Sequence, residues 1–247
     1  MGTLVHLDEF KTLLQNYSVS EATKQALKRI DFVALVAPTS SGRNTIIREL
    51  LKTGNYRFVV SDTTRAPREN DGIMERDGVE YWFRSEEEVL IELRAGEMLE
   101  AAVIHNQQIS GISLRELKTA ITEDKIAITD MEIMGVATIK RLKPDAKVIY
   151  VLPPGFEEWQ RRLMHRGKMT KPELQRRMES ASQELAAALQ HDYYLFVVND
   201  DVDRAAEVIN SIARFDSVNN VEQTRGRQIA EQLYIETRTF LGAKQTS

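Results

Sequence analysis

The feature that most restricts the fold is an uninterrupted apolar run, Phe32 to Ala37, which leads through a polar loop into a helical pattern. An apolar run without polar alternation is typical of a strand that is buried on both faces. After the loop, apolar residues recur with helical spacing at Ile46, Ile47, Leu50 and Leu51. Strand, loop and helix in this order favour an α/β fold with a parallel, helix-covered sheet.

The same alternation continues along the chain. Further buried strands are predicted at 58–61, 126–130, 148–152 and 195–198. Helical patterns lie at about 86–95, 113–122, 135–142, 156–165, 172–190 and 203–213. Strands and helices that alternate in this way predict a parallel sheet with helices on both faces. Residues 62–112 differ, because they combine short β-like pieces with turn signals, and we expect them to form an insertion beside the sheet.

Both ends of the chain are predicted to be helical. Ser18 and Glu21 have the spacing of a capping box before an amphipathic helix. A second, charged amphipathic helix runs from about Val221 to Phe240. We therefore expect helical extensions at 1–30 and 214–247 around a main domain at 31–213. Packing on the core is the main interpretation of the extensions, with a dimer contact or a partner site as alternatives.

Composition excludes several kinds of site. The chain has 247 residues, no cysteine and four scattered histidines, so thiolate sites are excluded and a zinc site is disfavoured. The net charge of -4 argues against a general nucleic-acid binder. No apolar run is long enough to cross a bilayer and no signal peptide opens the sequence, so we expect a cytoplasmic protein without a membrane partner. The oligomeric state is left open.

The loop between the first strand and its helix is a candidate phosphate site. Backbone N–H groups and a helix N-terminus point at whatever binds there, which favours phosphate. A P-loop has glycine first, then Gly-Lys and a hydroxyl residue. This loop keeps only Gly42, and Ala37, Arg43 and Asn44 stand at the other positions. Arg43 retains the positive charge, and Asn44 offers magnesium an amide oxygen in place of a hydroxyl. Without further context, an ordinary strand-to-helix turn is an equal alternative.

Residues 61–68 form a candidate anion clamp. Arg65 and Arg68 follow a run of hydroxyl residues and flank Pro67. Guanidinium groups bind phosphate in a bidentate manner, and proline stiffens the loop that carries them. A solvated turn is the alternative.

Together these segments resemble the guanylate kinase family, and the resemblance extends in order over about 32–213. The matching motifs are Ser61-Asp62-Thr63-Thr64-Arg65-Ala66-Pro67-Arg68, Asp77-Gly78-Val79-Glu80-Tyr81-Trp82-Phe83, Gly96-Glu97-Met98-Leu99-Glu100, Asp130-Met131-Glu132-Ile133-Met134-Gly135, Leu152-Pro153-Pro154, Arg162-Leu163-Met164-His165-Arg166-Gly167 with Arg177, and Val197-Val198-Asn199-Asp200.

The resemblance implies a P-loop NTPase-type parallel sheet with a mixed β monophosphate-binding region at 62–112 and a helical lid at 156–185. The implied reaction is ATP plus GMP to ADP plus GDP, with Mg²⁺. It assigns ATP to Pro38, Thr39, Ser40, Ser41, Gly42, Arg43, Asn44, Thr45 and Asn199. It assigns GMP to Ser61, Arg65, Arg68, Tyr81, Glu100 and Asp130. The implied catalytic residues are Arg43, Arg162, Arg166 and Arg177, and the implied metal contact is Asn44.

Departures from the family pattern keep other functions open. The segment between Arg68 and Tyr81 is about four residues longer than in the family. Ser110 stands at the position of a tyrosine, and Ile112 at that of a guanine-contacting hydroxyl. The alternatives are therefore a catalytically impaired nucleotide- or protein-binding module and a kinase for another monophosphate. The lid arginines could also form a solvated helix face paired with Glu158 and Glu173.

Overall fold

The computed structural model describes residues 4–70, 72–165 and 169–243. The chain forms two compact units. Unit 1 comprises Met1–Phe32, Arg57–Thr129 and Thr138–Pro144. Unit 2 comprises Val33–Tyr56, Asp130–Ala137 and Asp145–Ser247.

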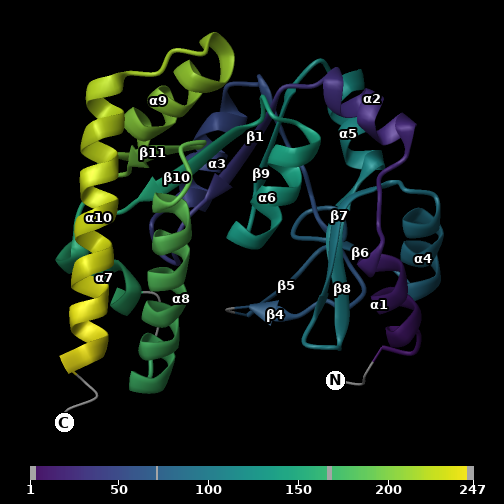
Figure 1. Cartoon of the computed structure of the whole chain (residues 1–247), viewed down its shortest axis with the longest axis horizontal. Coiled ribbons are helices and arrows are strands. Elements are labelled where there is room, and N and C mark those ends of the chain that lie inside the picture. Colours follow the sequence, from purple (N-terminus) through teal and green to yellow (C-terminus); the bar gives the residue numbers. More distant parts are fainter. Residues whose placement is uncertain (1–3, 71, 166–168, 244–247) are drawn as a thin grey trace. The chain divides into compact units, whose positions relative to one another are not determined.

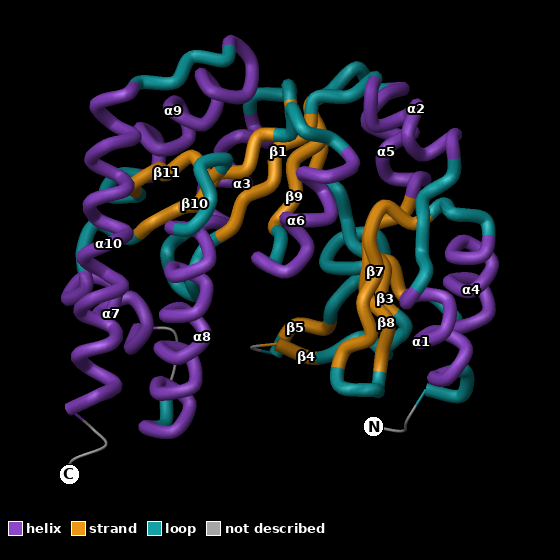
Figure 2. Tube along the Cα trace, viewed as in Figure 1, coloured by secondary structure: helices purple, strands orange, loops and turns teal. Residues whose placement is uncertain are grey.

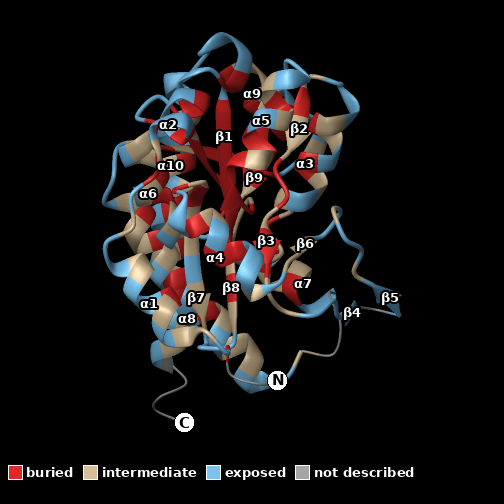
Figure 3. Ribbon diagram, turned by 90° about the vertical axis from the view of Figure 1, so that its right-hand side faces the viewer, coloured by how far each residue is buried: buried red, intermediate tan, exposed pale blue. Residues whose placement is uncertain are grey.

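Unit 2 is built on parallel strands in the order β11-β10-β1. Its elements are β1 (Phe32–Val36), α3 (Arg43–Lys52), β10 (Lys147–Leu152), α7 (Phe156–His165), α8 (Lys171–Leu189), β11 (Tyr194–Val198), α9 (Val202–Phe215) and α10 (Asn220–Ala243). Helix α10 runs along α8 and β11, and α3 packs on α9 (Figure 1). All five residues of β1 are buried, as their apolar run predicts (Figure 3).

Unit 1 contains a mixed sheet in the order β6-β3-β8-β7. Its strands β3, β7 and β8 are labelled in Figure 2. Strand β3 pairs parallel to β6 and antiparallel to β8, which in turn pairs antiparallel to β7. The elements are α1 (Leu7–Gln15), α2 (Glu21–Lys28), β3 (Asp62–Thr63), β4 (Glu69–Asn70), β5 (Ile73–Met74), β6 (Trp82–Phe83), α4 (Glu86–Arg94), β7 (Met98–Ile104), β8 (Gln108–Ser113) and α5 (Leu114–Thr122). The predicted mixed β insertion is confirmed.

Four elements extend across the division between the units. They are β1, whose first residue Phe32 belongs to unit 1, β2 (Tyr56–Phe58), β9 (Ile126–Asp130) and α6 (Ile133–Leu142). Most of the expected helices and strands are confirmed, with their ends shifted by three residues or fewer. Among the described residues, no helix has the length and apolar character needed to span a membrane.

Two local predictions are wrong. The side chain that caps α2 is Ser20, which accepts from the Thr23 amide at 3.2 Å, and not Ser18. The strand expected at 58–61 lies at Tyr56–Phe58 instead. It ends early because the Val60 amide donates to the buried Glu116 carboxylate at 3.1 Å, which takes the place of a strand partner.

Candidate functional site

The loop after β1 has an unusual backbone. Gly42 has φ +93° and precedes the first residue of α3, and Ser40 also lies in the left-handed region at φ +67°. A Cβ on Gly42 would lie 2.1 Å from Nδ2 of Asn199. Both the backbone angle and this close approach require glycine. Their combination explains why this position keeps the glycine of the phosphate-loop pattern.

Three side chains from distant parts of unit 2 hold the loop. Asn199, 2% exposed, donates through Nδ2 to the Ser41 carbonyl at 2.7 Å. Arg162 donates to the Ser41 carbonyl at 3.4 Å and to the Asn199 carbonyl at 3.1 Å. Trp159 donates its indole N–H to the Thr39 carbonyl at 2.8 Å. The structure thus brings Asn199 and Arg162 to the predicted ATP loop and adds Trp159, which the sequence analysis missed.

Arg43 is anchored at the first turn of α3. Its Nη2 donates to Oδ2 of Asp130 at 2.8 Å. Asp130 ends β9, and the next amide, Met131, donates to the Leu35 carbonyl at 3.0 Å. The sequence assigned Asp130 to GMP, whereas its carboxylate is paired here with the arginine of the phosphate loop. A role of Asp130 toward GMP stays a prediction.

The loop also has polar atoms without a protein partner. Twelve buried side-chain polar atoms of the described residues have no hydrogen-bond partner, and four of them lie at this loop: Ser40 Oγ, Ser41 Oγ, Arg43 Nε and Asn199 Oδ1. Buried polar groups in proteins are almost always satisfied. Four unsatisfied atoms around one glycine-containing loop are therefore well suited to a polar ligand such as a phosphorylated nucleotide.

A cavity of about 360 Å³ adjoins this loop. Its lining consists of Thr39, Glu173, Arg176, Arg177, Ser180, Ala181 and Glu184. Burial raises the pKa of Glu184, with a further increase from the negative charge of Glu132, while Ser180 and the positive charge of Arg43 act in the opposite direction. Sequence reasoning missed Glu184 as a site residue. The nearest signal was its place on the predicted helix that carries Arg177.

The lid arginines are paired with carboxylates of their own helices. Arg162 Nε donates to Glu158 at 2.7 Å and Arg177 Nη2 to Glu173 at 2.5 Å, both with i,i+4 spacing. Hydrogen bonds from Arg161 and Arg162 lower the pKa of Glu158 to about 2. These are the partners expected for a solvated helix face. Arg162 nevertheless reaches the loop, and Arg177 lines the cavity. Arg166 lies outside the described residues.

In unit 1, Arg65 of the predicted anion clamp is paired with a carboxylate of the chain. Its two terminal nitrogens donate to Glu75 at 2.5 and 2.9 Å, and both side chains are 7% exposed. The guanidinium carbon lies 4.7 Å from the ring centroid of Tyr81 and 5.7 Å from that of Phe83. The hydrogen bonds with Glu75 raise the pKa of Arg65. Arg65 and Tyr81 therefore lie together, as the sequence predicts.

Glu75 is a residue that the sequence analysis missed. It follows the β4–β5 hairpin, in the segment treated as an insertion between Arg68 and Tyr81. Besides binding Arg65, its carboxylate accepts from the Arg68 amide at 2.9 Å. Arg68 itself is exposed. One carboxylate thus orients both ends of the clamp, and the need of a buried arginine for an acidic partner was the only signal for it.

The remaining GMP candidates lie at the sheet of unit 1. The Ser61 carbonyl accepts from the Trp82 amide at 2.9 Å. Glu100 on β7 lies opposite Ile112 on β8, whose side chain is 1% exposed. A Cβ on Gly111 would lie 2.3 Å from the Glu100 carbonyl oxygen. The glycine therefore allows β8 to approach the strand that carries Glu100.

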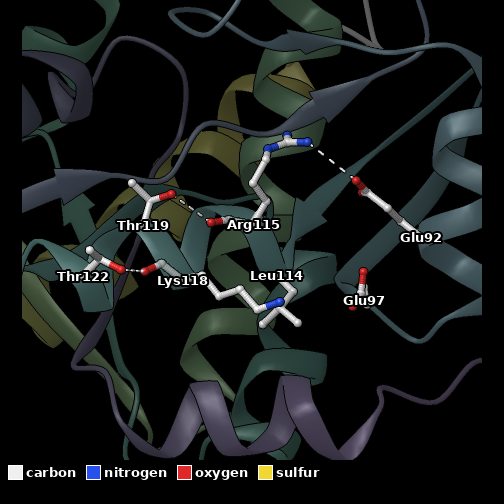
Figure 4. A pocket seen from close by; sticks show the side chains of 7 residues that line it. All are labelled: Glu92, Glu97, Leu114, Arg115, Lys118, Thr119 and Thr122. Atoms are coloured by element: carbon white, nitrogen blue, oxygen red, sulfur yellow. Dashed lines mark hydrogen bonds and ion pairs between the residues drawn. The ribbon is translucent and has the colours of Figure 1, made fainter.

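A second cavity, of about 390 Å³, lies in unit 1 (Figure 4). Its lining residues are Glu92, Glu97, Leu114, Arg115, Lys118, Thr119 and Thr122. Arg115 is paired with Glu92 at 3.6 Å and with the buried Asp62 at 2.6 Å. The sequence-predicted GMP residues are not among its lining, and its Arg115–Glu92 pair joins α5 to α4.

The described residues contain no cluster of three or more histidine, aspartate or glutamate side chains that could hold a metal ion. Asn44 is exposed in the first turn of α3. Mg²⁺ is typically bound in kinase sites through one or two protein oxygens, waters and substrate phosphates. The donors near the loop therefore fit an ion that arrives with a nucleotide, and they do not fit an all-protein cage.

Comparison with known proteins gives a consistent result. The family model described as guanylate kinase matches residues 29–214. A guanylate kinase of Corynebacterium diphtheriae is 36% identical over 182 residues, covering 73% of this chain and 92% of that protein. One of Bifidobacterium longum is 37% identical over 185 residues, covering 73% and 91%. The crystal structure of guanylate kinase from Anaplasma phagocytophilum superimposes with a TM-score of 0.55 at 25% identity, covering 82% of this chain and 94% of that one.

Proposed function

Because the chain belongs to the guanylate kinase family, we propose that it transfers the γ-phosphoryl group of ATP to GMP and releases ADP and GDP. The observation that carries this proposal is the loop after β1. It is held by Asn199, Trp159 and Arg162, and its buried atoms Ser40 Oγ, Ser41 Oγ and Arg43 Nε have no hydrogen-bond partner within the described residues. A phosphoryl donor fits this arrangement of N–H groups and positive charge.

On the donor side, the loop from Pro38 to Thr45 binds the ATP phosphates. Phosphoryl transfer depends on positioning and on neutralising charge more than on covalent help from the protein. Arg43 and Arg162 stabilise the charge that develops on the transferred group, with Arg166 and Arg177 from the lid. Asn199, which already binds the loop, lies against the adenine.

Magnesium accompanies ATP in this proposal. Asn44 would supply one amide oxygen to the ion, with phosphate and water oxygens as its other ligands. The ion would neutralise phosphate charge when bound. The proposal also includes a cytoplasmic location, where both nucleotides are available.

On the acceptor side, the clamp of unit 1 holds the GMP phosphate. Arg65 and Tyr81 bind it directly, and Arg68 and Ser61 complete the clamp. Glu75 keeps the Arg65 fork in a fixed orientation, which lowers the entropy lost when phosphate binds. Glu100 accepts from the guanine edge. The buried Ile112 leaves this carboxylate as the main determinant of base choice.

A coupled ADP-release assay with magnesium-ATP and each of GMP, dGMP, AMP, CMP and UMP tests the proposal. We expect turnover with GMP and, more weakly, with dGMP. Arg162→Ala lowers kcat by roughly 100-fold or more if this arginine stabilises the transferred group. Arg161→Ala is a matched control, because Arg161 pairs with the same Glu158 but is 60% exposed. Equal effects of the two variants would contradict the assignment.

A nucleotide-binding module without turnover is the second candidate. It is favoured by the arginines Arg43 and Arg65, which are each bound to a carboxylate of the chain. The Arg43→Lys/Asn44→Ser variant separates the two candidates. Turnover that appears only in this variant would support the binding module, and turnover in the natural protein supports the kinase.

A further inference from the structure

Each terminal extension places one side chain against the edge strand of a sheet. We infer that the two extensions are substrate-specific positioning elements, with Tyr17 acting on the GMP side and Gln223 on the ATP side. This inference rests on the proposed function, since it assigns each contact to one substrate of that reaction. The family match spans residues 29–214 and so includes neither residue.

The N-terminal contact is made to β7, the strand that carries Glu100. The Tyr17 hydroxyl donates to the Met98 carbonyl at 2.5 Å and accepts from the Met98 amide at 2.9 Å. Strand β7 lies at the edge of its sheet, and its pairing with β8 is irregular between Met98 and Glu100. One phenol therefore satisfies both main-chain groups of Met98, two residues before Glu100, where strand pairing is least regular.

The rest of the N-terminal extension secures this contact. The Ser20 amide and the Thr23 hydroxyl both donate to the Gly96 carbonyl at 2.8 Å. Phe10 is fully buried in a cluster with Leu93 and Met98. The extension thus shares a hydrophobic core with the strand that it orders, which fixes the position of the Tyr17 ring.

The C-terminal contact is made to β11, the strand that leads to Asn199. Oε1 of Gln223 accepts from the Phe196 amide at 2.8 Å, and Nε2 donates to the Phe196 carbonyl at 3.3 Å. Strand β11 is also an edge strand. A Cβ on Gly226 would lie 2.7 Å from the Phe196 Cβ and 2.9 Å from its carbonyl oxygen. Helix α10 therefore approaches β11 so closely that only glycine fits.

Helix α10 reaches the phosphate loop by a second route. The rings of Phe240 and Phe156 are 6.0 Å apart, and those of Phe156 and Trp159 are 6.1 Å apart. Trp159 in turn donates to the Thr39 carbonyl of the loop. Both routes run from the C-terminal extension to residues that surround ATP in the proposed function, and all of them lie within unit 2.

These contacts also bear on the alternative role of the extensions as docking surfaces. An exposed edge strand is the part of a sheet that pairs with another chain. At Met98 and Phe196 the main-chain groups already have side-chain partners within the same unit. The extensions therefore occupy these points of the two edges, which disfavours dimer formation by strand addition there.

Steady-state kinetics of Tyr17→Phe and Gln223→Leu test the inference. Each change removes polar contacts and keeps most of the side-chain volume. Tyr17→Phe removes both hydrogen bonds with Met98. We expect it to raise the KM for GMP roughly three- to ten-fold, a factor equivalent to the net free energy of about one hydrogen bond, and to leave the KM for ATP unchanged. We expect Gln223→Leu to raise the KM for ATP by a similar factor and to leave that for GMP unchanged.

Tyr56→Phe is the control for the loss of a buried hydroxyl. Tyr56 is 2% exposed and its hydroxyl donates to Oδ1 of Asn210 at 2.8 Å. It should change neither KM, because general destabilisation lowers the active fraction without distinguishing the substrates. If both test variants leave both KM values unchanged, or raise them without selectivity, the extensions are structural only and the inference is wrong.

Equilibrium binding of GMP and of ATP to the natural protein separates this failure from failure of the proposed function. If neither nucleotide binds to the natural protein, the proposed function is wrong, and the inference is overturned with it. If both bind and the dissociation constants of the two variants match those of the natural protein, only the inference is overturned. Selective weakening of GMP binding in Tyr17→Phe and of ATP binding in Gln223→Leu supports it.

Discussion

Replacing Gly42 by alanine should destabilise unit 2 through two separable effects. The first is the backbone angle, φ +93°, which an L-residue adopts at a cost of about 1–2 kcal/mol. The second is the contact of 2.1 Å between the new Cβ and Asn199 Nδ2. The amide must move away, and the loss of its bond to the Ser41 carbonyl costs a further 1–3 kcal/mol, roughly. We expect Gly42→Ala to lower the free energy of unfolding by about 2–5 kcal/mol.

Gly54→Ala isolates the first effect. Gly54 has φ +77° and an added Cβ there would meet no described atom within 4 Å. Gly54→Ala should therefore lower the free energy of unfolding by only about 1–2 kcal/mol. Asn199→Ala isolates the second effect, because without that side chain the new Cβ at position 42 keeps only an ordinary contact of 3.9 Å with Arg162. The double variant Gly42→Ala/Asn199→Ala should lose about 1–3 kcal/mol less unfolding free energy than the two single variants lose together.

Urea unfolding measures these differences, followed by the fluorescence of Trp159. The other tryptophan, Trp82, lies in unit 1, so a Trp82→Phe background reports on unit 2 alone. Additive costs of Gly42→Ala and Asn199→Ala, or equal costs of Gly42→Ala and Gly54→Ala, would refute the argument. In that case the amide of Asn199 would not be packed against this glycine, and its role in holding the loop would have to be abandoned.

Two other changes test the pairing of arginines. Glu75→Gln leaves the buried Arg65 without its carboxylate. We therefore expect the free energy of unfolding, measured with urea, to fall by about 3–5 kcal/mol, and GMP to bind more weakly. The more exposed control Glu80→Gln should lower the free energy of unfolding by at most about 1 kcal/mol. For Glu158, whose folded pKa is lowered to about 2 from 4.5, the stabilising contribution is present above pH 4.5 and is lost as the pH falls toward 2. The difference in unfolding free energy between the natural protein and Glu158→Gln should therefore be constant above about pH 5.5 and shrink below it, and a difference that grows with acidification would contradict the lowered pKa.

Much of the fold follows from local patterns. The apolar run of β1 and the helical spacing after it predict the strand, loop and helix that form the centre of unit 2, because a short, uninterrupted apolar run is typical of a strand that is buried on both faces. The cap of α2 shows where local patterns fail. Ser18 and Ser20 both precede the helix, and the tertiary bond from the Ser20 amide to the Gly96 carbonyl favours the second. No short-range spacing contains that information.

The same distinction applies to the candidate site. Gly42, Arg65 and Tyr81 could be predicted because their motifs are contiguous in the sequence. Trp159 and Glu75 could not. The partner of Trp159 lies 120 residues away, and Glu75 stood in a segment of uncertain register. Both residues act by orienting other site residues, and such supporting contacts depend on the assembled fold rather than on a pattern of residue types.

The altered phosphate loop is compatible with turnover because Arg43 is held in a fixed orientation by Asp130. A lysine presents three equivalent donors on a flexible chain, whereas Arg43 has five N–H donors in a rigid fork. One terminal nitrogen of that fork is already bound to Asp130, and its buried Nε has no partner among the described residues. The pair with Asp130 therefore fixes the direction of the guanidinium and leaves donors for a phosphate oxygen. On this argument Arg43→Lys alone would weaken the loop, since a point charge in its place would lose the orientation that Asp130 provides.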